Sequence, residues 1–382
     1  MSDALTLAQK LIRAQSVTPD RGAALDVLQA ALEPMGFVCT RYPFGDVDNL
    51  YARLGSAAPV LAFAGHTDVV PVGDEDGWTR GPFSGDLEDG VLWGRGAADM
   101  KGAIAAFVAA TGHYLDQNGP PPGSIAFLMT GDEEGPAING TVKLMEALHA
   151  AGERFDQVIV GEPTNPNHLG ETIKVGRRGS LNGVVTVTGR QGHVAYPELA
   201  ANPVPVMMAF LGQLLARTLD DGAPHFQHSN LEVTSIDVGN TAHNVIPGRA
   251  TAKFNIRFNT AHKGDDLKRW IESEAKAVDL DFNGSIDLDL AVTGEAFLST
   301  PGPFVATLQD AIEAETGRRP ALTTGGGTSD ARFIRNYAPV CEFGLVGATM
   351  HQIDERVPAS DVETLTRIYA RVIDGYFAGP KK

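Results

Sequence analysis

Cysteine and basic residues are scarce in this chain of 382 residues. Only Cys39 and Cys341 occur, far apart in the sequence, so neither a disulfide framework nor a thiolate zinc knuckle can be built. The 31 Lys and Arg residues face 47 Asp and Glu residues, for a net charge of −16. This balance argues against a protein whose main task is to hold nucleic-acid phosphates. Any metal centre must use histidine and carboxylate ligands.

Long apolar runs are also missing. The apolar stretch 103–110 falls well short of the roughly 20 residues that cross a bilayer. Asp3 stands where a signal peptide would carry Lys or Arg, so we expect a cytoplasmic protein. Hydrophobic residues make up 43% and charged residues 20% of the chain, which excludes global disorder and provides for a large core.

Helical and strand-like patterns alternate in the first part of the chain. The expected helices cover residues 3–15, 21–35, 101–117 and 139–150. The expected strands cover residues 59–65, 124–130 and 157–161. Alternation of this kind is typical of an α/β fold with a mostly parallel sheet flanked by helices.

After Gly179 the sequence pattern becomes typical of an α+β fold, and from Thr300 the α/β pattern returns. The middle block carries a helix near 203–218 and alternating strands near 184–188, 230–238, 250–258 and 281–291. The last part carries helices near 303–316 and 360–376 and an apolar run at 338–345. We therefore expect an α/β domain of residues 1–178 and 294–382 that carries an inserted α+β domain of residues 179–293.

His66 and Asp68 follow the buried run Val60–Ala64. The carboxyl end of a strand in an open α/β sheet is where ligands bind, and the i, i+2 spacing points both side chains to one side. Asp68 could accept the ring N–H of His66 and aim the other ring nitrogen at a metal. A strand-end turn with a capping Asp68 is the structural alternative.

Three further acidic positions stand at equivalent places of the following units. Asp99 precedes a predicted helix, where such a residue taken by itself is more often an N-cap. Asp132, Glu133 and Glu134 follow an apolar strand and would repel one another unless a cation or protons lie among them. Glu162 follows the next strand. With His66 and the late His351, these residues form a mixed nitrogen and oxygen set suited to two zinc ions that share one carboxylate.

Five ordered motifs make the chain resemble the M20 family of zinc-dependent aminoacylases and peptidases, from the first helix to the last. They are Gly65-His66-Thr67-Asp68-Val69-Val70-Pro71, Gly94-Arg95-Gly96-Ala97-Ala98-Asp99-Met100-Lys101-Gly102, Gly131-Asp132-Glu133-Glu134-Gly135, Gly161-Glu162-Pro163-Thr164 and the late His351. The resemblance implies a zinc-peptidase-like catalytic domain with an inserted lid and dimerisation domain. It also implies two Zn²⁺ ions per subunit, with Co²⁺ able to substitute, and a homodimer.

The resemblance assigns a role to each residue of these motifs. Asp99 would bridge both metal ions and would be followed by a cis peptide to Met100. The remaining metal ligands would be His66 and Glu162 at one position and Glu134 and His351 at the other. The catalytic residues would be Asp68, which orients His66, Glu133, which is the general base, and His193.

His193 lies in the middle block, in a segment that resembles the family's lid histidine. In relatives this histidine reaches the partner subunit's active site and stabilises the developing oxyanion. Without the resemblance, an exposed histidine of this kind would more often be inert.

Specificity must come from residues outside the metal ligands. Donors that could clamp substrate carboxylates are Arg177, Arg178, Ser180, Asn244, Arg257, Gly326 and Thr328. For the glycine run 325–327 and Arg332, a turn and a surface side chain are the structural alternatives. A phosphate cradle is disfavoured because no Lys-Ser or Lys-Thr pair follows the glycines.

The resemblance, including the segments 325–333 and 350–355, predicts zinc-dependent hydrolysis of the amide bond of N-succinyl-L,L-2,6-diaminopimelate. The small-molecule products would be succinate and L,L-2,6-diaminopimelate, in the biosynthesis of diaminopimelate and lysine. The alternatives are acetylornithine deacetylation, another aminoacylase or dipeptidase activity, and a non-catalytic zinc-dependent binding protein. Glu133 argues against the last, because a binder needs no base beside its metals. No nucleic acid or membrane partner is expected, and the lack of a Gly-x-Ser-x-Gly segment disfavours serine hydrolysis.

Overall fold

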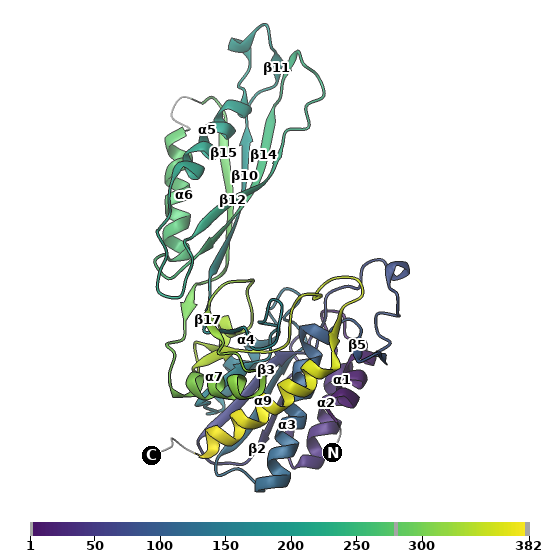
Figure 1. Cartoon of the computed structure of the whole chain (residues 1–382). Helices are drawn as coiled ribbons and strands as arrows, with labels where there is room; N and C mark the ends of the chain where they lie inside the picture. The colour runs from purple at the N-terminus through teal and green to yellow at the C-terminus, as the bar shows by residue number, and fades with distance from the viewer. Residues whose placement is uncertain (1–2, 279–281, 379–382) are drawn as a thin grey trace. The chain divides into compact units, whose positions relative to one another are not determined.

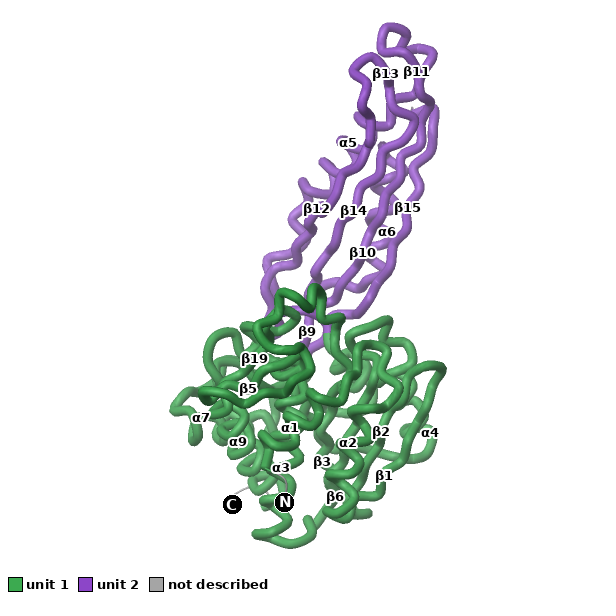
Figure 2. The backbone as a smooth tube through the Cα atoms, turned by 90° about the vertical axis from the view of Figure 1, so that its right-hand side faces the viewer, with its two compact units in different colours: residues 1–175, 299–323, 329–382 green, residues 176–298, 324–328 purple. Residues whose placement is uncertain are grey.

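The computed structural model describes residues 3–278 and 282–378, which divide into two compact units (Figure 2). Unit 1 comprises Met1–Val175, Ser299–Thr323 and Ser329–Lys382, and unit 2 comprises Gly176–Leu298 and Thr324–Thr328. These limits differ from the predicted 178/179 and 293/294 by a few residues, and unit 2 also takes in the short segment 324–328. The role of the middle segment as a lid and dimerisation domain stays a prediction.

Unit 1 is built on an eight-stranded sheet with the order β1-β2-β6-β3-β7-β18-β8-β17. Its strands are β1 (Val38–Arg41), β2 (Asn49–Leu54), β3 (Val60–His66), β6 (Ser124–Thr130), β7 (Gln157–Val160), β8 (Thr172–Lys174), β17 (Ala321–Thr323) and β18 (Val340–Glu342). The central pairs β6-β3, β3-β7 and β7-β18 are parallel. Every residue of β3 and β6 is buried, as expected for parallel strands that are covered on both faces.

Helices α1, α3 and α9 pack against one another, and α7 packs on α9 (Figure 1). The helices of unit 1 are α1 (Ala4–Arg13), α2 (Ala23–Leu32), α3 (Gly102–Asn118), α4 (Thr141–Ala150), α7 (Pro303–Thr316), α8 (Ala331–Ile334) and α9 (Ala359–Ala378), with short helical turns η1 (Glu33–Met35), η2 (Glu75–Gly77) and η3 (Ala97–Lys101). Phe63 of β3 stacks on Phe107 of α3 at 4.5 Å and meets Tyr369 of α9 edge-on. These buried rings fix α3 and α9 over β3.

A small three-stranded sheet of unit 1 has the order β19-β5-β4. Its strands are β4 (Leu87–Glu88), β5 (Val91–Trp93) and β19 (Arg356–Pro358). It places the segment before η3 next to the segment before α9, although the two are far apart in the sequence.

Unit 2 is a four-stranded antiparallel sheet, β12-β14-β10-β15, with two helices packed on it. Its elements are β9 (Gly176–Arg177), β10 (Gly179–Thr188), β11 (Gly192–His193), η4 (Pro197–Leu199), α5 (Pro203–Ala216), β12 (Asn230–Asp237), β13 (Val245–Ile246), β14 (Arg249–Phe258), α6 (Gly264–Val278), β15 (Ser285–Gly294) and β16 (Phe297–Leu298). Alternate residues of β10 and β14 are buried. They form a core with Phe210 of α5 and Ile271 of α6.

The predicted fold class is confirmed, and the predicted elements correspond to observed ones with shifted ends. The predicted strand 281–291 is observed as β15 from Ser285, and its residue 281 lies outside the described residues. The prediction for Asp99 as an N-cap is wrong. Helix α3 begins at Gly102, and Asp99 lies inside η3 with non-helical φ −124° and ψ 93°.

None of the helices within residues 3–278 and 282–378 combines the length and the hydropathy that a membrane span requires.

Candidate active site

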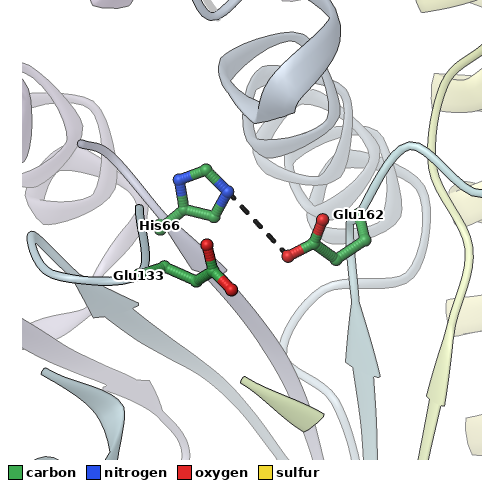
Figure 3. Close-up of side chains that lie close together, drawn as sticks. All are labelled: His66, Glu133 and Glu162. Carbon is green, nitrogen blue, oxygen red and sulfur yellow. Dashed lines mark ion pairs between the residues drawn. The ribbon is translucent and has the colours of Figure 1, made fainter. Parts of the chain in front are cut away.

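The carboxyl ends of parallel strands in unit 1 bring the predicted metal ligands together. His66 ends β3, Glu133 and Glu134 follow β6, and Glu162 follows β7. Because β6, β3 and β7 are adjacent and parallel, these residues share one edge of the sheet. Figure 3 shows His66, Glu133 and Glu162 at this edge, with Nε2 of His66 3.9 Å from Oε1 of Glu162.

Asp99 lies between the two histidines and offers one carboxylate oxygen to each. Its Oδ1 lies 3.1 Å from Nε2 of His66, and its Oδ2 lies 3.3 Å from Nε2 of His351. His351 Nε2 also lies 2.9 Å from Oε1 of Glu134. The structure therefore brings all five predicted metal ligands into one cluster and places Asp99 at its middle. The Asp99–Met100 peptide is cis, as the resemblance implies.

The cluster carries more carboxylates than its histidines can balance, and most of it is buried. His66 is 1% exposed, whereas the side chain of His351 is 47% exposed. Burial alone would lower the pKa of His66, but Asp99, Glu162 and Asp68 outweigh it and raise the pKa well above its usual value. Hydrogen bonds to Asp99 and Glu134 raise the pKa of His351 to about 10. Each imidazole thus lies where the carboxylates favour a positive charge.

These residues fit divalent metal ions. Ligand atoms of His66, Asp99 and Glu134 lie within 4.8 Å of one another, and so do those of His66, Glu133 and Glu162. Imidazole nitrogens and carboxylate oxygens without thiolates are a donor set that Zn²⁺ and related divalent ions accept. A cation among buried carboxylates would also relieve their mutual repulsion. The described residues thus contain candidate metal-ligand groups at the predicted place.

Glu133 lies in this cluster but is not part of the predicted ligand set. Burial raises the pKa of Glu133 to about 8; His66 opposes this shift, while Asp330 and Glu134 add to it. Asp330 precedes α8 and accepts a hydrogen bond from Thr141 Oγ1 at 2.6 Å. Sequence reasoning missed Asp330. The only available signal was an acidic residue in the glycine-rich run 325–333, which by itself has no defined role.

Asp68 contacts His66 differently from the prediction. The His66 ring Nδ1 lies 2.9 Å from the backbone carbonyl oxygen of Asp68, whereas the Asp68 carboxylate is 3.8 Å away. That carboxylate instead accepts hydrogen bonds from the backbone N–H groups of Glu133 and Glu134 at 3.0–3.2 Å. The carbonyl oxygen of Asp68 therefore orients the ring, and its carboxylate holds the loop that carries Glu133 and Glu134. Burial raises the pKa of Asp68 to about 6.

The third acidic residue of that loop has a structural role. Asp132 accepts hydrogen bonds from the backbone N–H groups of Ala137, Ile138 and Asn139 at 2.9–3.2 Å. It fixes the turn between β6 and α4. Two of the three successive acids thus belong to the cluster.

The predicted substrate-binding residues lie in unit 2, where they fall into three groups. The first group consists of Arg178, Ser180 and Arg257. Ser180 and Asn230 each pair with Arg257 across the sheet, and Arg178 Nη1 donates a hydrogen bond to Asn230 Oδ1 at 3.0 Å. Burial lowers the pKa of Arg178, and the nearby charge of Arg257 lowers it further. Two guanidinium groups close enough to repel each other form a place that favours an anion.

The second and third groups lie elsewhere in unit 2. Arg177 donates to the carbonyl oxygen of Gly327 at 2.9 Å, which joins it to the segment that carries Gly326 and Thr328. His193 of β11 pairs with Val245 of β13, directly after Asn244. His193 is exposed, and its Nδ1 accepts the N–H of Ala195 at 3.0 Å. Their contact with substrate stays a prediction.

Residues 62–375 match the profile of peptidase family M20/M25/M40, and the chain belongs to this family. A succinyl-diaminopimelate desuccinylase of Maricaulis maris is 69% identical over 377 residues, which cover 99% of this chain and 96% of the relative. A protein of the same name from Caulobacter vibrioides is 58% identical, and the alignment covers 98% of this chain and 96% of that relative.

Solved structures share the fold. The M20 family metallo-carboxypeptidase Sso-CP2 from Sulfolobus solfataricus has a TM-score of 0.80 at 18% identity and covers 99% of this chain and 100% of its own. The aminopeptidase PepT from Bacillus cereus has a TM-score of 0.80 at 18% identity, with 97% of each chain covered.

Proposed function

We propose that the chain hydrolyses the amide bond of N-succinyl-L,L-2,6-diaminopimelate to succinate and L,L-2,6-diaminopimelate. Relatives 55–69% identical over nearly the whole chain are named for this activity. Within the structure, the observation that carries the proposal is the position of Asp99, which offers one oxygen toward each of two histidines. That arrangement suits a shared ligand of two metal ions in an amide hydrolase.

The proposed centre holds two Zn²⁺ ions, which Co²⁺ can replace. His66, Asp99 and Glu162 would hold one ion, and Asp99, Glu134 and His351 the other. When bound, the pair of divalent ions supplies Lewis acidity that polarises a carbonyl and lowers the pKa of water toward about 7.

Glu133 is the general base and acid of the proposed reaction. Its partly buried carboxylate lies next to His66 and Glu162, so it can take a proton from the attacking water. The same carboxyl group then gives a proton to the leaving amine nitrogen, which prevents the amine from being expelled as an anion. The Asp68 carboxylate supports this exchange by holding the backbone N–H of Glu133.

The substrate carries carboxylates at the succinyl end and at the amino-acid ends. Residues proposed to bind them are Arg177, Arg178, Ser180, Asn244, Arg257, Gly326 and Thr328. The contact of Arg178 with Asn230, which pairs with Arg257 across the sheet, supports this assignment, because guanidinium groups bind carboxylates well. We also propose a cytoplasmic homodimer in which His193 serves the active site of the other subunit. Light scattering would then give twice the mass of one chain.

The substrate proposal is tested with two substrates in parallel. The zinc-loaded protein and a chelator-treated control are incubated with N-succinyl-L,L-2,6-diaminopimelate and with N-acetyl-L-ornithine, and release of primary amine is measured. We expect chelator-sensitive release from the succinyl substrate alone. Release from acetylornithine alone would overturn the substrate assignment, and release from neither would favour another acyl substrate or a binding protein.

Replacing Asp68 with alanine tests how that residue acts. Because the backbone carbonyl orients His66 and the carboxylate holds Glu134, Asp68→Ala should weaken the metal position of Glu134 and His351 by about 10–100-fold. The metal position that includes His66 and Glu162 should keep its affinity for the ion. Equilibrium titration with Co²⁺ measures the dissociation constants of both positions. Selective loss at the Glu162 position would show that the carboxylate acts through His66 after all.

A further inference from the structure

A buried ion pair joins the segment that carries Asp99 to the segment that carries His351. Arg95 Nη1 lies 2.7 Å from Oε2 of Glu355, and the two residues are 2% and 0% exposed. A buried ion pair adds little net stability over well-packed apolar side chains of similar volume. The hydrogen bonds that the pair makes to the backbone are therefore the better guide to its role.

The carboxylate end of the pair holds the backbone around Asp99. Oε1 of Glu355 accepts the N–H groups of Ala98 at 2.9 Å and of Asp99 at 3.1 Å. Because Ala98 and Asp99 lie in the first turn of η3, directly after Gly96, their buried N–H groups have no acceptor in a preceding turn of helix and need another one. A charged carboxylate provides strong ones, so Glu355 fixes the peptide from which the Asp99 side chain extends.

The guanidinium end holds the turn that carries His351. Arg95 Nη1 donates to the carbonyl oxygen of Gln352 at 3.1 Å, and Nη2 lies 3.4 Å from that of His351. His351 has a φ of +62°, in a region that L-residues with a side chain rarely adopt. Its side chain is 47% exposed, so packing does little to hold it. The contacts from Arg95 hold the backbone of this turn, while Asp99 and Glu134 contact the ring.

We propose that Arg95 and Glu355 act as a positioning pair that couples Asp99 to His351 and thereby sets the affinity and geometry of the metal position formed by Asp99, Glu134 and His351. The inference rests on the proposed metal centre. Neither residue supplies a ligand in that assignment. Both act through the backbone of residues that do, over a separation of 260 positions in the sequence.

The test compares two arginines that each form an ion pair in unit 1. Arg95→Lys keeps the positive charge but loses the planar fork that serves Glu355 and the carbonyl oxygens together. Arg53→Lys is the matched control, since Arg53 pairs with Glu153 and lies opposite Ala126, toward the start of β6 and away from His66. Each metal-free variant is titrated with Co²⁺ against a chromophoric chelator, with thermal unfolding and visible spectra recorded in parallel.

We expect Arg95→Lys to raise the dissociation constant of one of the two Co²⁺ ions by about 10–100-fold and to change its visible absorption bands. At saturating metal, kcat should fall with little change in KM. Arg53→Lys should lower the unfolding temperature but keep both dissociation constants and the spectrum of the unchanged chain. If Arg95→Lys cannot be isolated folded, Glu355→Gln takes its place, because it keeps an acceptor oxygen and the side-chain volume.

Two results would overturn the inference, and they are distinguishable. If Arg95→Lys unfolds at a lower temperature yet binds both Co²⁺ ions as the unchanged chain does, the pair is merely structural and the metal centre stands. If the unchanged chain binds no Co²⁺, the metal centre itself is wrong, and the positioning role is lost with it.

Discussion

Replacing Glu133 with glutamine should lower kcat by about 10³-fold, within the range that general acid–base groups supply. The amide keeps the volume of the side chain and cannot take a proton from water. Because Asp68 accepts hydrogen bonds from the backbone N–H of Glu133, which the substitution leaves in place, the loop should keep its shape. Steady-state kinetics at saturating zinc, together with metal analysis after gel filtration, gives the result.

The matched variant for that experiment is Glu134→Gln, which changes the neighbouring residue in the same way. Glu134 lies 2.9 Å from the His351 ring, so its replacement should reduce metal content, while Glu133→Gln should retain two ions. Turnover close to that of the unchanged chain in Glu133→Gln would remove Glu133 from the role of base. Loss of metal from Glu133→Gln would instead show that Glu133 is a metal ligand.

Replacing Asp99 with alanine should abolish activity by removing metal from both positions. Its two oxygens face His66 and His351 separately, so a single substitution takes one ligand from each ion. Metal analysis after dialysis should find fewer than one ion per chain, whereas His351→Ala should retain one. The exposed Asp116 of α3 offers the control, and Asp116→Ala should retain both ions and full activity.

The Asp99 experiment has a clear contradictory outcome. If Asp99→Ala retains two ions per chain, Asp99 is not a shared ligand, whatever happens to activity. Far-ultraviolet circular dichroism of the same samples separates metal loss from unfolding.

Sequence reasoning predicted the cluster because strand ends converge in a parallel sheet. Buried runs end at His66, before Glu133 and before Glu162, and parallel pairing brings such ends to one edge. This follows from local hydrophobic patterns alone. The position of Asp99 did not follow from them, because an acid before a helix is usually an N-cap. Only the resemblance to the M20 family identified Asp99 as the carboxylate that both metal ions share.

Other features have no local signal. The contact of His66 with the carbonyl oxygen of Asp68 rather than its carboxylate depends on the path of the chain after β3. The pair formed by Arg95 and Glu355 joins residues 260 positions apart, which no window of sequence covers. Helix α6, by contrast, was missed although it has a local signal, because its buried residues Gly264, Leu267, Ile271 and Ala275 recur at helical spacing.

Titration of the metal-free chain with Zn²⁺ tests the central claim most directly, with succinate release from N-succinyl-L,L-2,6-diaminopimelate as the readout. The proposed centre predicts no release without metal, a rise as zinc is added and a plateau at two equivalents per chain. Succinate release that persists in the metal-free chain, or that reaches its plateau at one equivalent, would contradict a dinuclear zinc hydrolase.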